Sequence, residues 1–374
     1  MFAQNFLVDC VSALRHLVHS IISDCRAFKN KGVSLVPKSR EGAGILLRYR
    51  RRLIRKRLLW RAFRKRRELT CLQDNHTSIK PADVLLFSTV RNEAVRLPHF
   101  LEHYRALGVA HFFFVDNASE DGTTELLQSQ PDVTLYQSKA SYRQSRFGVD
   151  WLNWLKRKYA HGHWVVVADA DEILIYPDWQ SQPLPSLTAH LEQRGHKMMG
   201  ALMLDMYPKG PPDAQSYTPG QDPMTCIQWF DAHDYWVQQQ RKLGNFWLQG
   251  GARARMFFAD RPELAPTLNK IPLVHWSRGF AFVNSTHSAL PSRLNETSTT
   301  PISGALLHTK FLPGVAKRAA EERLRDEHFQ VGANYAEYYA SLTENPDMWF
   351  DGSQQFEGWE QLVDLGLMTA PDWS

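Results

Sequence analysis

The sequence predicts an α/β protein whose mostly parallel sheet is flanked by helices. Between residues 83 and 172, four apolar, strand-like segments alternate with amphipathic, helix-like segments, as is typical of right-handed βαβ units. The chain contains 43% hydrophobic and 22% charged residues, a composition that excludes a disordered protein. Its four cysteines have no paired spacing, which excludes a disulfide scaffold and favours a reducing compartment.

The predicted elements follow one another in a regular order. The strands are expected at 83–90, 111–116, 133–138 and 163–172. Helices are expected between them, the first stopped by Gly108 and the last by Gly162. A further helix at 183–196 and a strand ending near Asp205 follow. Strand-like segments then recur at 272–276 and 305–311, and the tail beyond residue 312 has a helical pattern.

The charge of the chain is concentrated in one segment. The net charge is +5, but residues 38–67 contain 14 Lys or Arg and one Glu, which gives 14 − 1 = +13. The rest of the chain therefore carries 5 − 13 = −8. Total charge is thus no argument for a nucleic-acid-binding body, and no specific nucleic acid is expected as a partner.

The basic segment also contains Leu, Trp and Phe at helix-like intervals. This pattern in residues 40–67 is typical of a helix at the headgroup layer of an anionic membrane. A solvated basic helix packed on the body and a non-specific RNA contact are the alternatives. The first 35 residues are interrupted by Asp9 and Arg15, so an amphipathic helix is expected there rather than a membrane span or export signal.

Acidic residues follow the fourth predicted strand. Asp169, Asp171 and Glu172 end an apolar run, and like charges this close repel one another unless a cation or hydrogen bonds compensate them. A divalent metal site is expected there. Asp116 and Asn117 follow the second strand, where a carboxylate can accept a hydrogen bond from a nucleobase or ribose; an ordinary Asx turn is the alternative.

Three segments together resemble the family 2 glycosyltransferases, in particular a bacterial branch with a DADE metal motif. They are STVRNEAVRLPHFLEHYRALGV, FFFVDNASEDGT and VVVADADEILIYP, and the resemblance covers residues 83–177. It implies a GT-A fold, a nucleotide diphosphate sugar donor and a divalent cation, Mn²⁺ or Mg²⁺. It also implies that Thr89, Arg91, Glu93 and Asn117 line the nucleotide pocket, Asp116 contacts the base, Asp169 faces the ribose and the metal, and Asp171 holds the metal.

On this resemblance the chain divides into three parts. Residues 1–80 form a basic amphipathic helical arm, 81–312 the GT-A glycosyltransferase domain, and 313–374 a helical tail. Within the domain, 81–177 is the nucleotide-sugar half and 178–312 the acceptor half. Glu172 is expected to support the metal through water.

Further side chains are candidates for the diphosphate and the metal. Lys139, Arg143 and Arg146 lie before the acidic strand, where they are expected to reach phosphates; a solvated face is the alternative. A late histidine completes the metal shell in GT-A enzymes, and His275, His287 and His308 are the candidates. His308 is favoured because Lys310 follows it at strand spacing.

The catalytic base is the least determined feature. An inverting transfer needs a group to accept the proton of the acceptor hydroxyl. Asp205 is the candidate because it ends a strand, with Asp231 and Asp234 as alternatives. The Glu-Asp pair usual in the family is missing from this region, which leaves both base and stereochemistry open. Trp247 is expected to stack on a sugar or to pack in the core.

Two functions from different classes follow. The first is metal-dependent transfer of a sugar to a glycan or lipid-linked acceptor, in cell-surface polysaccharide synthesis, by a cytoplasmic protein held at the inner membrane. The second is non-catalytic binding of a nucleotide sugar or glycan, with the arm recruiting a nucleic acid or protein. A nucleotidyltransferase is a distant third possibility, because no glycine-rich triphosphate loop precedes the acids.

Overall fold

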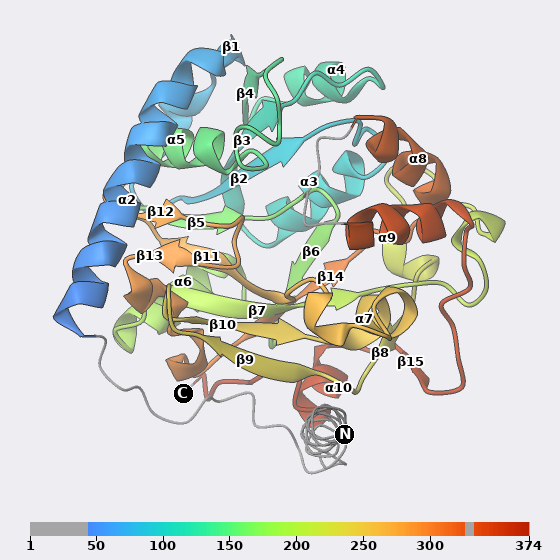
Figure 1. Ribbon diagram of the computed structural model, residues 1–374. Coiled ribbons are helices and arrows are strands. Elements are labelled where there is room, and N and C mark those ends of the chain that lie inside the picture. Colours follow the sequence, from blue (N-terminus) through green and yellow to red (C-terminus); the bar gives the residue numbers. More distant parts are fainter. Residues whose placement is uncertain (1–43, 326–332, 374) are drawn as a thin grey trace, which may run out of the picture. The chain divides into compact units, whose positions relative to one another are not determined.

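The computed structural model describes residues 44–325 and 333–373. These residues build one nine-stranded sheet (Figure 1). From edge to edge its strands are β1 (Thr70–Gln73), β4 (Val133–Gln137), β3 (Val109–Asp116), β2 (Val84–Val90), β5 (Trp164–Val167), β11 (Asn269–His275), β7 (Met198–Asp205), β14 (Gly304–His308) and β6 (Glu172–Ile175). The helix expected in the first 35 residues lies outside the described part.

The expectation of a mostly parallel sheet is wrong for half of it. Strands β4, β3, β2 and β5 are parallel neighbours, as the alternating pattern predicts. Strand β11 then pairs antiparallel with both β5 and β7, and β6 pairs antiparallel with β14. The second half lacks regular strand–helix alternation, so the sequence pattern carried no information on strand direction there.

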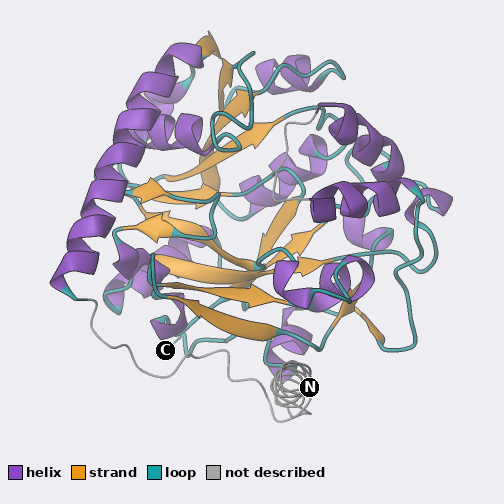
Figure 2. Cartoon of the chain, viewed as in Figure 1, coloured by secondary structure: helices purple, strands orange, loops and turns teal. Residues whose placement is uncertain are grey.

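The parallel strands are largely apolar because both faces of the sheet are covered. Phe87 of β2 stacks on Phe113 of β3 with ring centroids 4.6 Å apart, and both side chains are buried. Helices lie on both sides of the sheet (Figure 2). They include α3 (Leu97–Ala106), α4 (Thr123–Gln128), α5 (Val149–Tyr159) and α6 (Leu184–Gln193). The carboxyl ends of β2, β3 and β5 therefore point to one common edge.

The basic helix α2 (Ile45–Lys65) packs along the outside of the sheet domain (Figure 1). Its Leu58 and Ala62 are buried, and Leu58 contacts Ala281 and Leu290. The short turn η1 (Arg66–Glu68) leads from α2 into β1, which pairs with β4 at the edge of the main sheet. The residues before 81 therefore supply a strand of the sheet as well as a helix.

The tail forms helices and one short strand. Helices α8 (Val315–Arg325) and α9 (Ala333–Thr343) share a hydrophobic cluster with α7 (Gly251–Phe257). Strand β15 (Ser353–Gln355) pairs with β8 (Trp229–Asp231), and α10 (Trp359–Asp364) follows it. The described chain also contains two hairpins, β9 (Trp236–Gln240) with β10 (Asn245–Gln249), and β12 (Ala281–Phe282) with β13 (Ala289–Leu290). Among residues 44–325 and 333–373, no helix combines the length and apolarity needed to cross a bilayer.

Candidate active site

The acidic motif forms the turn between β5 and β6. The sequence suggested one strand through residue 172, but β5 ends at Val167 and β6 begins at Glu172. The backbone N–H of Glu172 donates to the carbonyl of Asp169 at 3.0 Å and closes the turn. The N–H of Thr309 donates to the carbonyl of Asp171 at 2.7 Å. The turn is therefore fixed by β14, which lies between β6 and β7.

Three strand ends bring one histidine between two carboxylates. His308, the last residue of β14, is in register with Asp205 of β7. Its Nε2 lies 3.2 Å from Oδ2 of Asp171, and its Nδ1 lies 2.6 Å from Oδ1 of Asp205. The Nε of Arg253, from α7, donates to Oδ2 of Asp205 at 2.7 Å. Asp171, His308, Asp205 and Arg253 thus form a continuous polar chain.

The charges in this chain stabilise one another. Burial alone would raise the pKa of Asp205, but the charge of Arg253 and the hydrogen bond from His308 lower it to about 2. Burial would also raise the pKa of Asp171, yet the charge and hydrogen bond of His308 hold it well below its usual range. Asp205 is consequently a carboxylate occupied on both oxygens, with a residue exposure of 4%.

Lys270 supplies the cation for the other two acids of the motif. Its Nζ lies 2.7 Å from Oε1 of Glu172 and 3.2 Å from Oδ2 of Asp169. Burial would lower the pKa of Lys270, but the charges of these two acids raise it. The Asp169 side chain stays 48% exposed, whereas that of Glu172 is 1% exposed. Asp169 can therefore meet a ligand, and Glu172 serves to hold Lys270.

Three more cations face Asp171 or its neighbours from separate elements. The charges of Arg96, at the start of α3, and Lys310, after β14, lower the pKa of Asp171. Arg318 of α8 is close enough to Arg96 and Asp171 for their charges to shift its own pKa, and burial is the main reason that this pKa falls to about 10. Nε of Arg96 is buried and has no hydrogen-bond partner among the described residues. Arg96 does donate to Glu93, at 2.6 Å.

The second acidic loop, between β3 and α4, is held by its own residues. Oδ1 of Asp116 accepts hydrogen bonds from the N–H of Ser119 at 3.0 Å and from its hydroxyl at 2.5 Å. Oδ2 accepts from the Thr124 hydroxyl at 2.5 Å. Asp116 is fully buried, and Nδ2 of Asn117 donates to the carbonyls of Ser138 and Ala140. These contacts agree with the Asx-turn alternative.

The residues after β2 pin this loop in place. Arg91 donates to the carbonyls of Asn117 and Ala118 at 2.6 and 2.7 Å. The N–H of Glu93 donates to the Thr123 hydroxyl at 2.8 Å. The Thr89 hydroxyl is buried and without a partner in the described chain. A Cβ built on Gly148 would lie 2.4 Å from this hydroxyl, so only glycine fits opposite Thr89.

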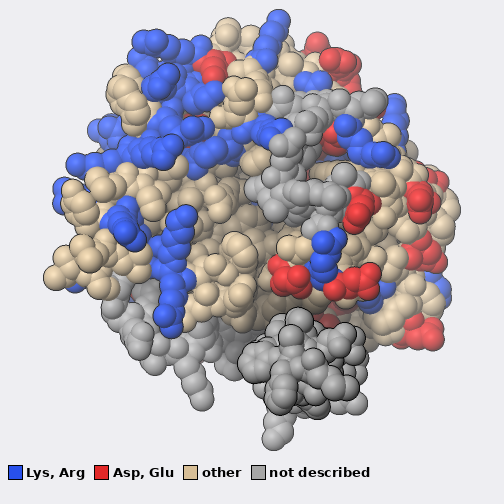
Figure 3. Space-filling view, in the orientation of Figure 1, with Lys and Arg blue, Asp and Glu red and all other residues tan. Residues whose placement is uncertain are grey.

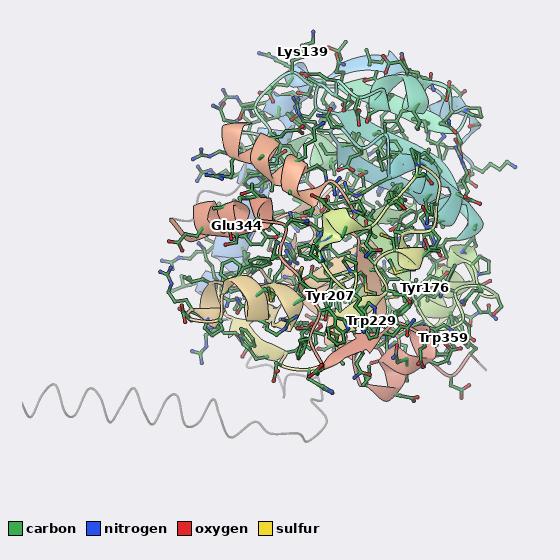
Figure 4. The ribbon with its side chains drawn as sticks, turned by 90° about the vertical axis from the view of Figure 1, so that its right-hand side faces the viewer. Lys139, Tyr176, Tyr207, Trp229, Glu344 and Trp359 are labelled. Atoms are coloured by element: carbon green, nitrogen blue, oxygen red, sulfur yellow. The ribbon has the colours of Figure 1, made fainter. Side chains whose placement is uncertain are left out.

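In the basic loop before α5, Arg146 has its partners outside the acidic turn. Arg146 donates to Oδ1 of Asp150 at 2.5 Å and to the carbonyl of Val283 at 2.6 Å. Lys139 is exposed and lies at the outer edge of the molecule (Figure 4). Arg143 is half-buried.

The structure separates the three candidate histidines. Burial lowers the pKa of His287 to about 3, and its Nδ1 lies 2.7 Å from the carbonyl oxygen of Asn269. His275 lies 3.9 Å from Glu192 and packs against Trp164. Of the three, His308 is the one beside Asp171.

Asp231, one of the two alternative bases, lies in a hydrogen-bond network with Tyr207 and Arg255. Asp231 pairs with Arg255 at 2.8 Å and accepts a hydrogen bond from the Tyr207 hydroxyl. Tyr207 forms an isolated β-bridge with Trp229, and the two side chains lie close together in Figure 4. Asp234 has a positive φ of 64° at the start of the β9 hairpin. Trp247 of β10 is 36% exposed.

Sequence reasoning missed most of the cations of the site. Lys270 and Arg253 lie in segments with no motif, and Arg96 was hidden in an amphipathic helix pattern. Arg318 belongs to a helix expected only to pack on the body. The one available signal was a lysine directly before an apolar strand segment, as Lys270 is before residues 271–274.

The donor set suits a divalent cation that shares its coordination with a ligand. Asp171 and His308 offer a carboxylate and an imidazole nitrogen 3.2 Å apart, both accepted ligands of Mn²⁺. In the described residues, no three His, Cys, Asp or Glu side chains gather as a complete metal site. Phosphate oxygens and water would have to complete the shell, as is usual where a cation is bound together with a phosphorylated substrate.

Comparison with known proteins gives no family. No protein-family model and no curated protein matches the chain. Part of the chain is similar to a solved structure described as the crystal structure of 4-diphosphocytidyl-2C-methyl-D-erythritol synthase. The likeness covers 37% of this chain and 68% of that chain, at 16% identity and a TM-score of 0.23. A similarity this small carries no argument, so the α/β assignment rests on the strands described above.

Proposed function

We propose that the protein is a metal-dependent glycosyltransferase of GT-A type that takes a sugar from a nucleotide diphosphate donor. The observation that carries the proposal is the acidic turn between β5 and β6, where Asp171 faces His308 and a group of buried or half-buried cations. Such a site fits a ligand with several negative charges and a metal ion, which a nucleotide diphosphate with Mn²⁺ or Mg²⁺ would be.

Different residues of the site would bind the metal, the diphosphate and the ribose. Asp171 and His308 would hold the divalent cation, which when bound supplies a Lewis acid for the charge of the leaving diphosphate. Arg96, Lys310 and Arg318 would pair with diphosphate oxygens, and the buried, unpartnered Nε of Arg96 would gain an acceptor. Asp169, which is half exposed, would accept a hydrogen bond from the ribose.

Asp205 fits a positioning role better than that of a base. Both of its oxygens are bonded, one to His308 and one to Arg253. A carboxylate on the far nitrogen of a metal-binding histidine fixes the orientation and tautomer of the imidazole. A base must instead reach the acceptor hydroxyl. The base, and inverting or retaining stereochemistry, stay open in this proposal.

The acceptor belongs to the proposal only as a class. A glycan or lipid-linked acceptor, used in making a cell-surface polysaccharide at the cytoplasmic face of the inner membrane, suits the basic helix beside the catalytic domain. Trp229 of β8, which is half-buried, would offer aromatic surface to the acceptor. Aromatic rings commonly pack on sugar rings through their apolar faces.

The test is nucleotide release from a panel of nucleotide sugars with Mn²⁺. We expect UDP or GDP to appear with one donor, to disappear on chelation, and to be lost in Asp171→Asn. Glu120→Gln, whose side chain is 81% exposed in the neighbouring loop, is the matched control and should keep full activity. Turnover that survives both chelation and Asp171→Asn would refute the proposal.

The same panel separates the non-catalytic alternative. A protein that only binds would be stabilised against thermal unfolding by one nucleotide sugar and would release no nucleotide over hours. That result would replace the transferase proposal by a binding function.

A further inference from the structure

Helix α2 has two apolar faces that do different things. One face packs on the body, where Leu58 and Ala62 are buried and Ile54 and Leu59 pack against the same cluster. The opposite face has no neighbour within the described chain. The periodicity of the sequence alone could not separate the two, because apolar residues occur all round the helix.

The outward face carries an unusual share of the exposed apolar surface. Nine large apolar side chains are exposed in the described residues, and six of them belong to α2. The six are Ile45, Leu46, Tyr49, Leu53, Trp60 and Phe63. Leu46 is 81% exposed and Trp60 is 59% exposed. With 3.6 residues per turn, Leu46, Tyr49, Leu53 and Trp60 fall on one stripe along the helix.

Cations border this stripe on both sides. Helix α2 contains ten Lys or Arg and no acid. The exposed ones are Arg48, Arg50, Arg52, Lys56, Arg57 and Arg64. Figure 3 shows basic side chains gathered over this side of the molecule. The pKa of Arg55 is lowered, first by burial and then by the charges of Arg52 and Arg293, so like charges crowd one another here.

The helix is fixed to the catalytic domain. Arg51 donates to the carbonyls of Arg241 and Lys242 at 2.7 and 3.1 Å. Arg61 pairs with the buried Asp150 at 3.1 Å. Whatever the outward face binds is therefore held at a set orientation to the sheet domain.

A hollow lies at the carboxyl end of the same helix. It has a volume of about 250 Å³ and is lined by Arg61, Arg64, Lys65 and Glu68. Glu68 is paired with Lys65 at 2.5 Å and Arg61 with Asp150 at 3.1 Å, so the positive charge left over among the lining residues is that of Arg64. The hollow suits an anionic group the size of a phosphate ester.

We propose that the outward face of α2 lies in the headgroup layer of an anionic bilayer, parallel to the membrane plane, with the hollow taking a lipid phosphate. Ile45 and the four side chains of the stripe would enter the acyl boundary while the flanking cations meet lipid phosphates. Phe63 instead packs on the domain, with its ring centroid 5.9 Å from that of Trp154. This inference does not depend on the reaction that the sheet domain carries out.

Two other occupants fit the face less well. A nucleic acid would neutralise the cations and stack on Trp60 or Tyr49, but it would leave Ile45, Leu46 and Leu53 exposed, because aliphatic side chains do not stack on bases. A second copy of the chain would place two helices of the same positive charge against each other, which is repulsive. An anionic bilayer satisfies both the apolar stripe and the charge.

The test is flotation of the full chain with two kinds of vesicle, phosphatidylcholine alone and phosphatidylcholine with 30% phosphatidylserine. We expect the protein to float with the anionic vesicles and to stay at the bottom with the neutral ones. Arg50→Gln with Arg57→Gln should weaken the partition by roughly thirtyfold, because two headgroup contacts are lost. Leu46→Gln with Leu53→Gln should weaken it by about tenfold or more.

Matched controls separate the face from general charge and from misfolding. Lys80→Gln with Lys197→Gln removes two exposed cations elsewhere and should leave flotation unchanged. All three double variants should unfold at the wild-type temperature, since none of these side chains is buried. Hence loss of flotation reports the face itself.

Three results would overturn the proposal. The first is equal flotation with neutral and anionic vesicles. The second is flotation unchanged by the α2 variants. The third is failure to float at all, together either with tight binding of a 30-nucleotide RNA or with a dimer in light scattering that Leu46→Gln with Leu53→Gln abolishes.

Discussion

Two acidic loops at the same edge of the sheet differ in where their partners come from. The carboxylate of Asp116 is bonded by Ser119 and Thr124, three and eight residues further along the chain. The carboxylates of the β5–β6 turn face His308 and Lys270, which come from β14 and β11. The first loop uses its acid to hold its own shape. The second holds acids that only the folded sheet can compensate, and this is the arrangement expected of a binding site.

The largest expected effect is on Asp171. Asp171→Asn should reduce nucleotide release by about a thousandfold, because charge stabilisation at a leaving group contributes that much in comparable sites. The measurement is single-donor nucleotide release at saturating Mn²⁺. Asp116→Asn serves as the counterpart in the other loop and should reduce activity by no more than about tenfold. Equal losses in both variants would erase the contrast between the loops.

The second largest effect is expected at Asp205, where a substitution tests how His308 is oriented. Asp205→Asn should destabilise the fold by about 3 kcal/mol, because Arg253 would remain buried without its carboxylate. It should also raise the Mn²⁺ concentration needed for half-maximal activity by about tenfold or more, since it no longer orients His308. Denaturant unfolding measures the loss of stability, and a Mn²⁺ titration of activity measures the half-maximal concentration. If Asp205 were the catalytic base, Asp205→Asn would instead lose turnover at every Mn²⁺ concentration, and the Mn²⁺ concentration for half-maximal activity would not change.

The Asp116 loop should respond in stability. Asp116→Ala removes the acceptor of three hydrogen bonds and should cost about 2 to 3 kcal/mol of unfolding free energy. Urea denaturation measures it, with the exposed Glu120→Ala as the control expected to cost less than about 0.5 kcal/mol. If Asp116→Ala is instead as stable as the wild type and its KM for the donor is raised a hundredfold, Asp116 contacts the nucleobase, as the resemblance implied.

Two buried lysines, one with carboxylate partners and one without, extend the comparison to stability. Lys156 is 1% exposed, and its Nζ lies 4.5 Å from the Trp276 ring centroid and 4.1 Å from that of Phe282. No carboxylate of the described residues forms an ion pair with it. Lys270, by contrast, faces two acids. Lys156→Met should therefore stabilise the fold at pH 7 by about 2 kcal/mol, whereas Lys270→Met should destabilise it.

The pH dependence of Lys156 has a definite sign. Burial lowers its pKa well below the usual value, so between the folded pKa and about 10.4 the unfolded chain binds more protons. Stability from this group is present at high pH and is lost as the pH falls through that window. The difference in unfolding free energy between Lys156→Met and the wild type should thus shrink from pH 7 to pH 10. A constant difference would mean that the ammonium is not desolvated.

The sequence predicted what depends on local pattern. Apolar runs located β2, β3 and β4, and the acidic turn was expected at the end of the fourth strand. The partners of that turn were mostly not predictable, because Lys270 and Arg253 follow it by some 80 to 100 residues and no motif surrounds them. The direction of β11 and β6 was missed for the same reason. In α2, both apolar faces look alike until the body covers one of them.

The most direct test of the central claim is a Mn²⁺ titration followed by electron paramagnetic resonance, with and without the nucleoside diphosphate found in the donor panel. The account predicts that the diphosphate and the metal each tighten the binding of the other, and that Asp171→Asn abolishes this coupling. Tight coupling that persists in Asp171→Asn, or nucleotide binding that is indifferent to Mn²⁺, would contradict it.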